Sequence, residues 1–267
     1  MTACQLYESG YLSKTETERL LAFCNNSGPL FILGAVGSAI YANGQIGVVL
    51  YVSHIIATLL VGFLFRFYKN DKHTAPTYTL RQSEEGFSQI FSKVLANSIN
   101  SILTISGAVI FFSVISGIIT THLPMGDVAK SILTGVLELT GGTKAISQTA
   151  LPITIKLTLS AFIVGFAGIC VHIQVASIVA KYHLSLVPYI LGKCLHGLFS
   201  ALFTYLYFLI FPPKVSVFKS TSAILSAGFC MSSMYSVINI LFFAILGILV
   251  ITFTSLFITQ HAKNKRH

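Results

Sequence analysis

Long apolar segments separated by short polar ones run along most of the chain. Five of them are long enough to cross a bilayer, which takes about 20 mostly apolar residues in a helix. They cover residues 46–67, 97–121, 152–180, 185–211 and 235–259. A sixth segment, 17–42, carries a polar interruption at residues 25–29. This pattern predicts an all-α fold, a polytopic transmembrane helical bundle that forms one membrane domain over residues 1–267.

The remaining segments are polar or amphipathic. Residues 69–86 form a polar loop with mixed charges, and residues 87–96 (FSQIFSKVLA) have the amphipathic pattern of a helix at the membrane interface. Ser13 and Glu16 have the spacing of a capping box, which predicts a helix that begins just after Ser13.

Composition supports a membrane location. Hydrophobic residues make up 54% of the chain and charged residues 9%, whereas soluble domains carry about 25% charged residues. The net charge of +9 comes from lysines and arginines that lie between apolar segments and at the chain ends, not on one basic face. This excludes nucleic acid as a partner and leaves the lipid bilayer.

The distribution of positive charges predicts the orientation. Five lysines and arginines fall within residues 66–93, and others lie near the N-terminus, at Lys181 and in the C-terminal tail. Alternating spans place all of these on one side, which the positive-inside rule assigns to the cytoplasm. We therefore expect a multi-pass protein of the bacterial cell membrane with both termini cytoplasmic.

The interruption in the first apolar segment reads Asn25-Asn26-Ser27-Gly28-Pro29. Polar residues that break a helix at membrane depth are tolerated where they are buried in protein or line a wet cavity. Pro29 suits the first turn of a second half-helix, whose free N–H groups would face a polar solute. Broken helices of this kind build transporter sites. The alternative is a kink that satisfies its own hydrogen bonds.

Residues 125–150 contain an apolar core too short to span, which predicts a re-entrant or interfacial helix. Glu138 is the acidic residue of that core, and intramembrane carboxylates are usually functional. Thr140 and Gly141-Gly142 follow it, as expected at a re-entrant tip. The alternative is a surface helix with Glu138 in water.

Four further polar residues are candidates for the same cavity. His172 and Gln174 lie within the segment 152–180, where His172 either binds a solute or hydrogen-bonds within the bundle. Asn97 and Asn100 share a helical face and either line the cavity or join helices.

Three basic residues have simpler interpretations. His54, in the middle of a span, is expected to join helices. Lys193 and His196 share a face near the predicted inner end of their span, where snorkelling to the interface accounts for them.

The sequence holds none of the common catalytic motifs, namely HExxH, GxSxG, the P-loop or GxGxxG. Its five cysteines are scattered without the spacing of a zinc site. We therefore predict a non-enzyme without a metal or cofactor.

Four strings together resemble a known family: LLAFCNNSGPLFILGAVG (20–37), SHIIATLLVGFLFRFY (53–68), LELTGG (137–142) and VGFAGICVHIQVASIVAK (164–181). They look like the sporulation integral membrane proteins of the YlbJ family. That family is related to proteins with the nucleoside-recognition Gate domain, which resembles parts of concentrative nucleoside transporters and ferrous-iron transporters.

The resemblance implies a transporter-like sporulation protein that is needed for spore cortex formation, moves a small polar solute and has other sporulation membrane proteins as partners. Two alternatives stay open: a non-transporting scaffold for cortex assembly, and a membrane-embedded enzyme acting on a lipid-linked precursor. Family members have a longer N-terminal portion, so the chain is expected to match the C-terminal two-thirds only, as a truncated gene model or a short variant.

Overall fold

The computed structural model describes residues 2–69 and 86–213, and this part of the chain is all-helical. In chain order the helices are α1 (Thr2–Glu8), α2 (Lys14–Cys24), η1 (Leu30–Ile40), α3 (Gly44–Phe65), α4 (Phe87–His122), α5 (Asp127–Leu137), α6 (Leu139–Gln148), α7 (Ile153–Phe166), α8 (Gly168–Ala180) and α9 (Val187–Ile210). The predicted span 235–259 and most of the predicted loop 69–86 lie outside the described residues.

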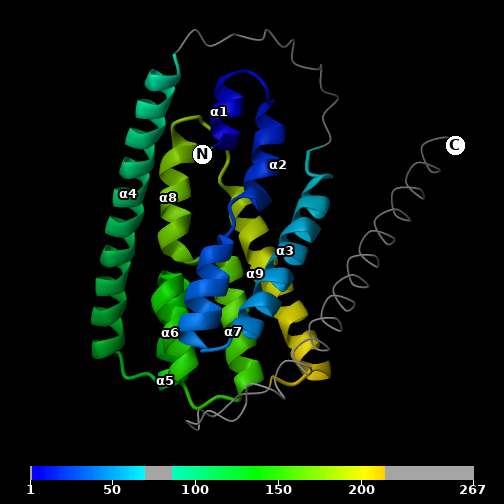
Figure 1. The fold of residues 1–267 in the computed structure, drawn as a ribbon, viewed down its shortest axis with the longest axis vertical. Helices are drawn as coiled ribbons and strands as arrows, with labels where there is room; N and C mark the ends of the chain where they lie inside the picture. Colours follow the sequence, from blue (N-terminus) through cyan, green and yellow to red (C-terminus); the bar gives the residue numbers. More distant parts are fainter. Residues whose placement is uncertain (1, 70–85, 214–267) are drawn as a thin grey trace, which may run out of the picture.

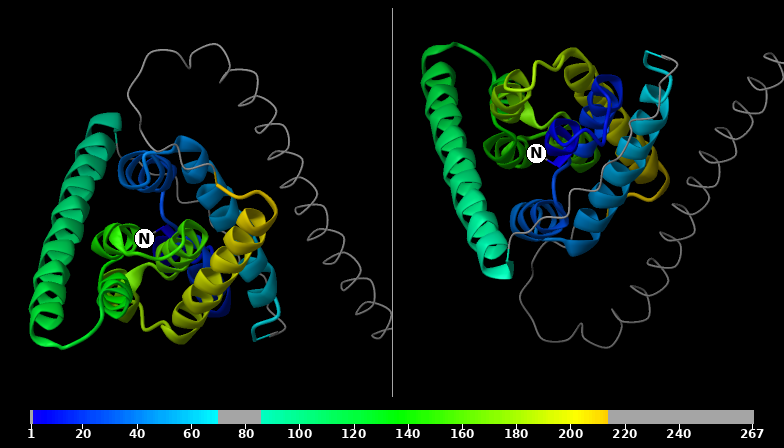
Figure 2. Two further views of the ribbon diagram at one scale, coloured as in Figure 1. Left: turned by 90° about the horizontal axis from the view of Figure 1, so that it is seen from below. Right: turned by 90° about the horizontal axis from the view of Figure 1, so that it is seen from above.

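The bundle is organised around α9, which packs against α7, α3 and α2 (Figure 1). The short helices α5 and α6 form a hairpin that packs on α7, and α4 lies along the outside against α5 and α8. Views from both ends show α4 at one edge of the bundle and α3 at the other (Figure 2). Most side chains of α4 are exposed.

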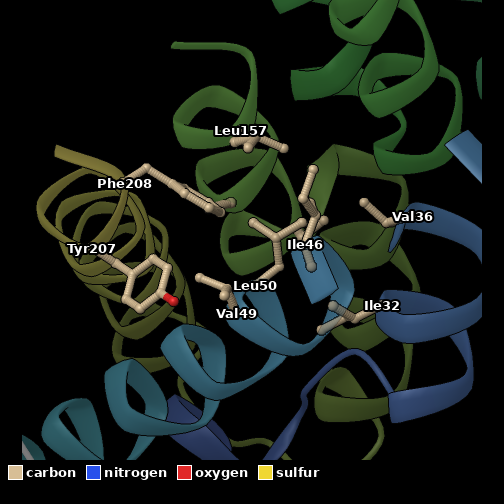
Figure 3. Close-up of a cluster of buried hydrophobic side chains, with 10 residues drawn as sticks. Ile32, Val36, Ile46, Val49, Leu50, Leu157, Tyr207 and Phe208 are labelled. Carbon is tan, nitrogen blue, oxygen red and sulfur yellow. The ribbon is translucent and has the colours of Figure 1, made fainter. Parts of the chain in front are cut away.

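One apolar core joins η1, α3, α7 and α9. Ile32 and Val36 of η1 contact a group of side chains that includes Val49 of α3, Leu157 of α7 and Phe208 of α9 (Figure 3). All five are at most 4% exposed. Burial of one such side chain contributes about 1.5–3 kcal/mol relative to water, although for helices already in lipid the gain comes from packing.

Four of the described helical segments are long and apolar enough to cross a membrane: Gly44–Phe65, Phe87–His122, Ile153–Ala180 and Val187–Ile210. The all-α membrane bundle predicted from the sequence is confirmed. The predicted interfacial helix 87–96 and span 97–121 form one continuous helix, α4. At about 1.5 Å per residue it is longer than the roughly 30 Å hydrocarbon layer.

The first apolar segment is interrupted where the polar residues predicted it. Helix α2 ends at Cys24, and η1, a π-helix, begins at Leu30. The capping box predicted at the start of α2 is also present, with Ser13 Oγ accepting from Glu16 N at 3.2 Å.

A second interruption was not predicted. The segment 152–180 is divided into α7 and α8 at Ala167 and Gly168, which both have left-handed backbone conformations with φ of 72° and 73°. A Cβ on Gly168 would lie 3.2 Å from Leu137 O and 3.4 Å from Glu138 Cα. The break therefore packs directly against the turn between α5 and α6, which requires both the glycine conformation and its lack of a side chain.

Close backbone contact also sets the α7–α9 packing. A Cβ on Gly165 would lie 2.8 Å from Gly197 Cα, so these two helices meet through glycine. Small residues at such contacts are typical of helices in membranes.

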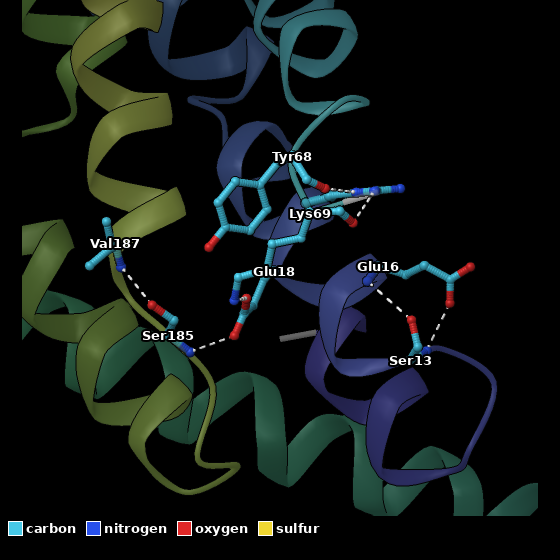
Figure 4. Close-up of polar contacts among 8 residues, drawn as sticks. Ser13, Glu16, Glu18, Tyr68, Lys69, Ser185 and Val187 are labelled. Atoms are coloured by element: carbon cyan, nitrogen blue, oxygen red, sulfur yellow. Dashed lines mark hydrogen bonds and ion pairs between the residues drawn. The ribbon is translucent and has the colours of Figure 1, made fainter. Parts of the chain in front are cut away.

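The end of the bundle that holds the start of α2 is fixed by polar contacts (Figure 4). Glu18 of α2 is fully buried and accepts from Lys69 Nζ at 3.2 Å and from Ser185 N at 3.0 Å. Arg19 donates to the backbone carbonyls of Tyr68 and Lys69, both at 2.7 Å. Tyr68 and Glu18 together raise the pKa of Lys69. These contacts join α2 to the end of α3 and to the α8–α9 connection.

Candidate functional site

The three interruptions of the helical chain meet at one pocket. Ser27 comes from the α2–η1 break, Glu138 from the α5–α6 turn and Ala167 from the α7–α8 break. The pocket has a volume of about 170 Å³ and is lined by Ser27, Phe31, Ile105, Val109, Glu138, Leu139, Thr140, Ala167, Cys170, Val171 and Gln174. Four of these residues were predicted from the sequence as cavity candidates: Ser27, Glu138, Thr140 and Gln174.

Glu138 is held in place by the helix that follows it. It has an extended backbone between α5 and α6, and its carboxylate accepts from Thr140 N at 2.8 Å and Gly141 N at 2.6 Å. A carboxylate at a helix N-terminus satisfies free N–H groups and interacts favourably with the helix dipole. The side chain is 3% exposed. Two backbone N–H groups of α6 thus hold the Glu138 side chain at the pocket.

The tip of the hairpin differs from the prediction. Gly141-Gly142 was expected at the tip, but both glycines lie within α6 and the turn is at Glu138. Gly142 allows α6 to approach the Gly135 backbone of α5. The glycines therefore serve helix packing, while the capping carboxylate ends one helix and begins the next.

The two asparagines of the first break bind within the bundle. Asn26 donates to Phe23 O at 2.8 Å and accepts from Thr58 Oγ1 of α3 at 3.2 Å. Asn25 donates to the hydroxyl of Tyr189 on α9 at 3.3 Å. These side chains hold the break between α3 and α9, and neither residue lines the pocket. Pro29 is exposed and directly precedes η1.

His172 and Gln174 point in different directions from α8. His172 is buried, with Nδ1 2.7 Å from Gly168 O and its ring 5.2 Å from that of Tyr189. His172 is not among the residues that line the pocket. Gln174 lines the pocket and donates to Cys170 Sγ at 3.3 Å.

Asn97 and Asn100 are exposed on α4 and do not line the pocket. Their backbone carbonyls accept from Ser101 and Thr104 one turn later, and α4 reaches the pocket through Ile105 and Val109 instead. The shared helical face predicted for the asparagines lies N-terminal to the part of α4 that contacts the bundle.

The structure also buries basic residues for which the sequence indicated snorkelling. Lys193 is 0% exposed and His196 is 1% exposed, so the snorkelling interpretation is wrong. Both point into the bundle, where His196 Nε2 donates to His54 O at 3.0 Å. The signal was the spacing of polar positions 193, 196, 200 and 204 along one face of α9.

The pocket can bind a ligand through a few polar side chains that are set among apolar ones. Glu138 supplies an acceptor, Ser27 a hydroxyl and Gln174 an amide, while Phe31 and Val109 add apolar surface. Among the described residues there is no group of three or more histidine, cysteine or acidic side chains that could hold a metal ion.

Comparison with known proteins supports a membrane role. The chain is similar to the sporulation integral membrane protein YlbJ of Bacillus subtilis (strain 168), with 28% identity over 260 residues that cover 82% of this chain and 64% of that protein. This confirms the resemblance inferred from the sequence. The chain spans less than two-thirds of the length of this relative. No family model matches the chain, and no solved structure matches it.

Proposed function

We propose that this chain is a sporulation membrane protein of transporter-like architecture that binds a small polar solute in the pocket between the three helix interruptions. The observation that carries the proposal is the convergence of Ser27, Glu138 and Ala167 from breaks far apart in sequence. A helix needs no break to anchor a protein in a membrane. Three breaks that meet at one pocket are typical of a substrate site.

The lining of the pocket indicates the kind of solute. Its walls are mostly apolar, and Ser27, Thr140 and Gln174 provide a few polar groups. A small pocket of this type selects by shape and by a few directed hydrogen bonds. The pocket adjoins all three breaks, so movement of the α5–α6 hairpin against α8 would open or close it. This is the basis for a transport role rather than simple binding.

The sporulation context comes from the printed name of the B. subtilis relative. A role in spore cortex formation and partnership with other sporulation membrane proteins are part of the same proposal. The chain spans 64% of that relative. The proposal therefore concerns only the pocket that the described residues of this chain form.

The experiment changes the pocket without changing a structural contact between helices. Gln174→Leu and Ser27→Ala are introduced together into the gene in sporulating cells, and cortex thickness is measured by electron microscopy. The amount of protein in the membrane fraction is measured in parallel. We expect a thin or absent cortex with normal protein levels, because the pocket loses two of its polar groups while the helix breaks are kept.

Asn97→Leu is the matched control, because it removes one polar side chain from an exposed position on α4 away from the pocket. It should leave the cortex normal. Normal cortex in the double pocket variant would contradict the proposal. If deletion of residues 70–85 then abolished the cortex, a scaffold function would take its place.

A further inference from the structure

A second polar group is buried in the bundle, apart from the pocket. It consists of five side chains, one from α3 and four from one face of α9, and we call it the α9 polar cluster. Its members are His54, Lys193, His196, Ser200 and Thr204, each at most 1% exposed. The two histidine rings lie 4.3 Å apart between centroids. Lys193 precedes His196 by three residues on the same face of α9.

Most polar atoms of the α9 polar cluster have no hydrogen-bond partner among the residues that the structure describes. These atoms are both ring nitrogens of His54, Nζ of Lys193, Nδ1 of His196 and the hydroxyls of Ser200 and Thr204. Buried polar groups are nearly always satisfied by protein, water or a ligand. Six such atoms follow the buried face of α9 and the facing His54, and the group formed by Lys193, His196 and His54 at its start indicates a site for something other than protein.

The chemistry of the cluster favours an anion as that ligand. A lysine ammonium has three donors and no acceptor, and hydroxyls and imidazoles also donate. A charge in the membrane interior is costly unless it is paired. A metal cation would be repelled by Lys193, and water alone would leave the charge without a counter-ion.

No described carboxylate serves as the counter-ion of Lys193, because the acidic side chains of the described residues are engaged or exposed elsewhere. Glu18 bonds to Lys69 and Ser185, Glu138 caps α6, Glu16 bonds to Ser13, Glu8 accepts from Tyr182, and Asp127 is exposed at the start of α5. The α9 polar cluster is thus basic, and the described part of the chain supplies no acidic partner to it.

We propose that the α9 polar cluster binds a small monovalent inorganic anion, such as chloride, against Lys193 Nζ. The site is separate from the solute pocket, with which it shares no residue. A bound anion would balance the lysine charge and bridge α3 to α9 through the histidine pair. It would stabilise the packing of the helix that contacts α2, α3 and α7.

The test uses the purified full chain in detergent, with chloride as the probe and gluconate as the reference anion at constant ionic strength. A ligand that binds only the folded state raises the melting temperature with concentration. We expect chloride to raise the Tm of the wild-type protein, and Lys193→Met to remove this dependence. Lys144→Met, which removes an exposed lysine on α6, should retain it.

A second variant guards against misfolding of Lys193→Met. His54→Phe keeps the lysine and removes the two unsatisfied ring nitrogens that lie beside His196, so it should shift the half-maximal chloride concentration upward by about tenfold, the equivalent of about 1.4 kcal/mol. Line broadening of the chloride NMR signal by the wild-type protein, reversed by bromide, should report the same site. The anion-site proposal would be overturned by a Tm that does not respond to chloride, or by an equal response of the wild-type and Lys193→Met proteins. Because the solute-pocket variants are assayed by cortex formation, the two proposals can fail independently.

Discussion

Glu138 has both a structural role, as the cap of α6, and a place in the lining of the candidate site. Its carboxylate accepts two backbone N–H groups of α6 and at the same time lines the pocket. The carboxylate ends α5, begins α6 and directs the hairpin toward the α7–α8 break. A solute in the pocket would therefore meet a carboxylate already engaged by backbone donors, with its remaining lone pairs free to accept.

Glu138→Ala should destabilise the folded protein by about 1–2 kcal/mol, the usual effect of removing a helix cap. Glu138→Gln keeps one acceptor for the N–H groups and should cost less, since only the charge–dipole interaction is lost. Equilibrium unfolding of both variants in detergent measures the order. Equal losses for the two would show that the carbonyl acceptor adds nothing.

Some of these residue roles were visible in the sequence, and others were not. Glu138 stood out because an acidic residue in an apolar segment needs compensation, and Ser27 because it lies in a polar interruption. Lys193 was misjudged because a lysine near the end of a predicted span reaches water in most helices. Its burial depends on where α2, α3 and α7 pack around α9, which no local pattern indicates.

At the scale of elements, the α2–η1 break and the α7–α8 break have different causes. The α2–η1 break contains polar residues and a proline, so the sequence predicted it. The α7–α8 break occurs within Gly165-Phe166-Ala167-Gly168, which has only small and apolar residues. It forms because Gly168 fits against the α5–α6 turn, a long-range contact that overrides helix propensity. Nothing in the local sequence indicates the left-handed conformation of Gly168.

The α7–α8 break predicts opposite effects for two neighbouring substitutions. Ala167→Gly should leave stability unchanged or raise it by up to about 1 kcal/mol, because Ala167 has a positive φ that glycine adopts without strain. Gly168→Val should lower it by about 1–3 kcal/mol or more, since a β-branched residue is strained at this φ and its Cβ would lie 3.2 Å from Leu137 O.

Thermal and chemical unfolding of these two variants would give the comparison directly. Ala161→Gly, a buried change within α7, is a matched control for the loss of one methyl group in a regular helix, and should cost about 1 kcal/mol. If Gly168→Val were as stable as wild type, the break would not depend on its contact with the α5–α6 turn.

For the whole molecule, the polar contacts and the charges define two ends of the bundle. The Glu18 contacts join the starts of α2 and α9 to the end of α3, and Lys181 follows α8 at the same end. Lys144 and Lys156 lie in the region of the α6–α7 connection, where Lys156 Nζ donates to Ser147 O at 2.9 Å. Figure 1 shows the α5–α6 hairpin and the start of α7 at the opposite end from α1 and the start of α2. Among the described residues of the group that the positive-inside rule formed, Arg19, Lys69 and Lys181 therefore lie at one end of the bundle.

This arrangement predicts that the end holding Glu18 and Lys69 is cytoplasmic. Single cysteines at Ala180 and Thr121, both exposed and at the ends of α8 and α4, test it in a background with the five native cysteines replaced by serine. On intact cells a membrane-impermeant maleimide should label Thr121→Cys and reach Ala180→Cys only after permeabilisation. The reverse pattern would place the buried Glu18 network on the outer side and contradict the predicted orientation.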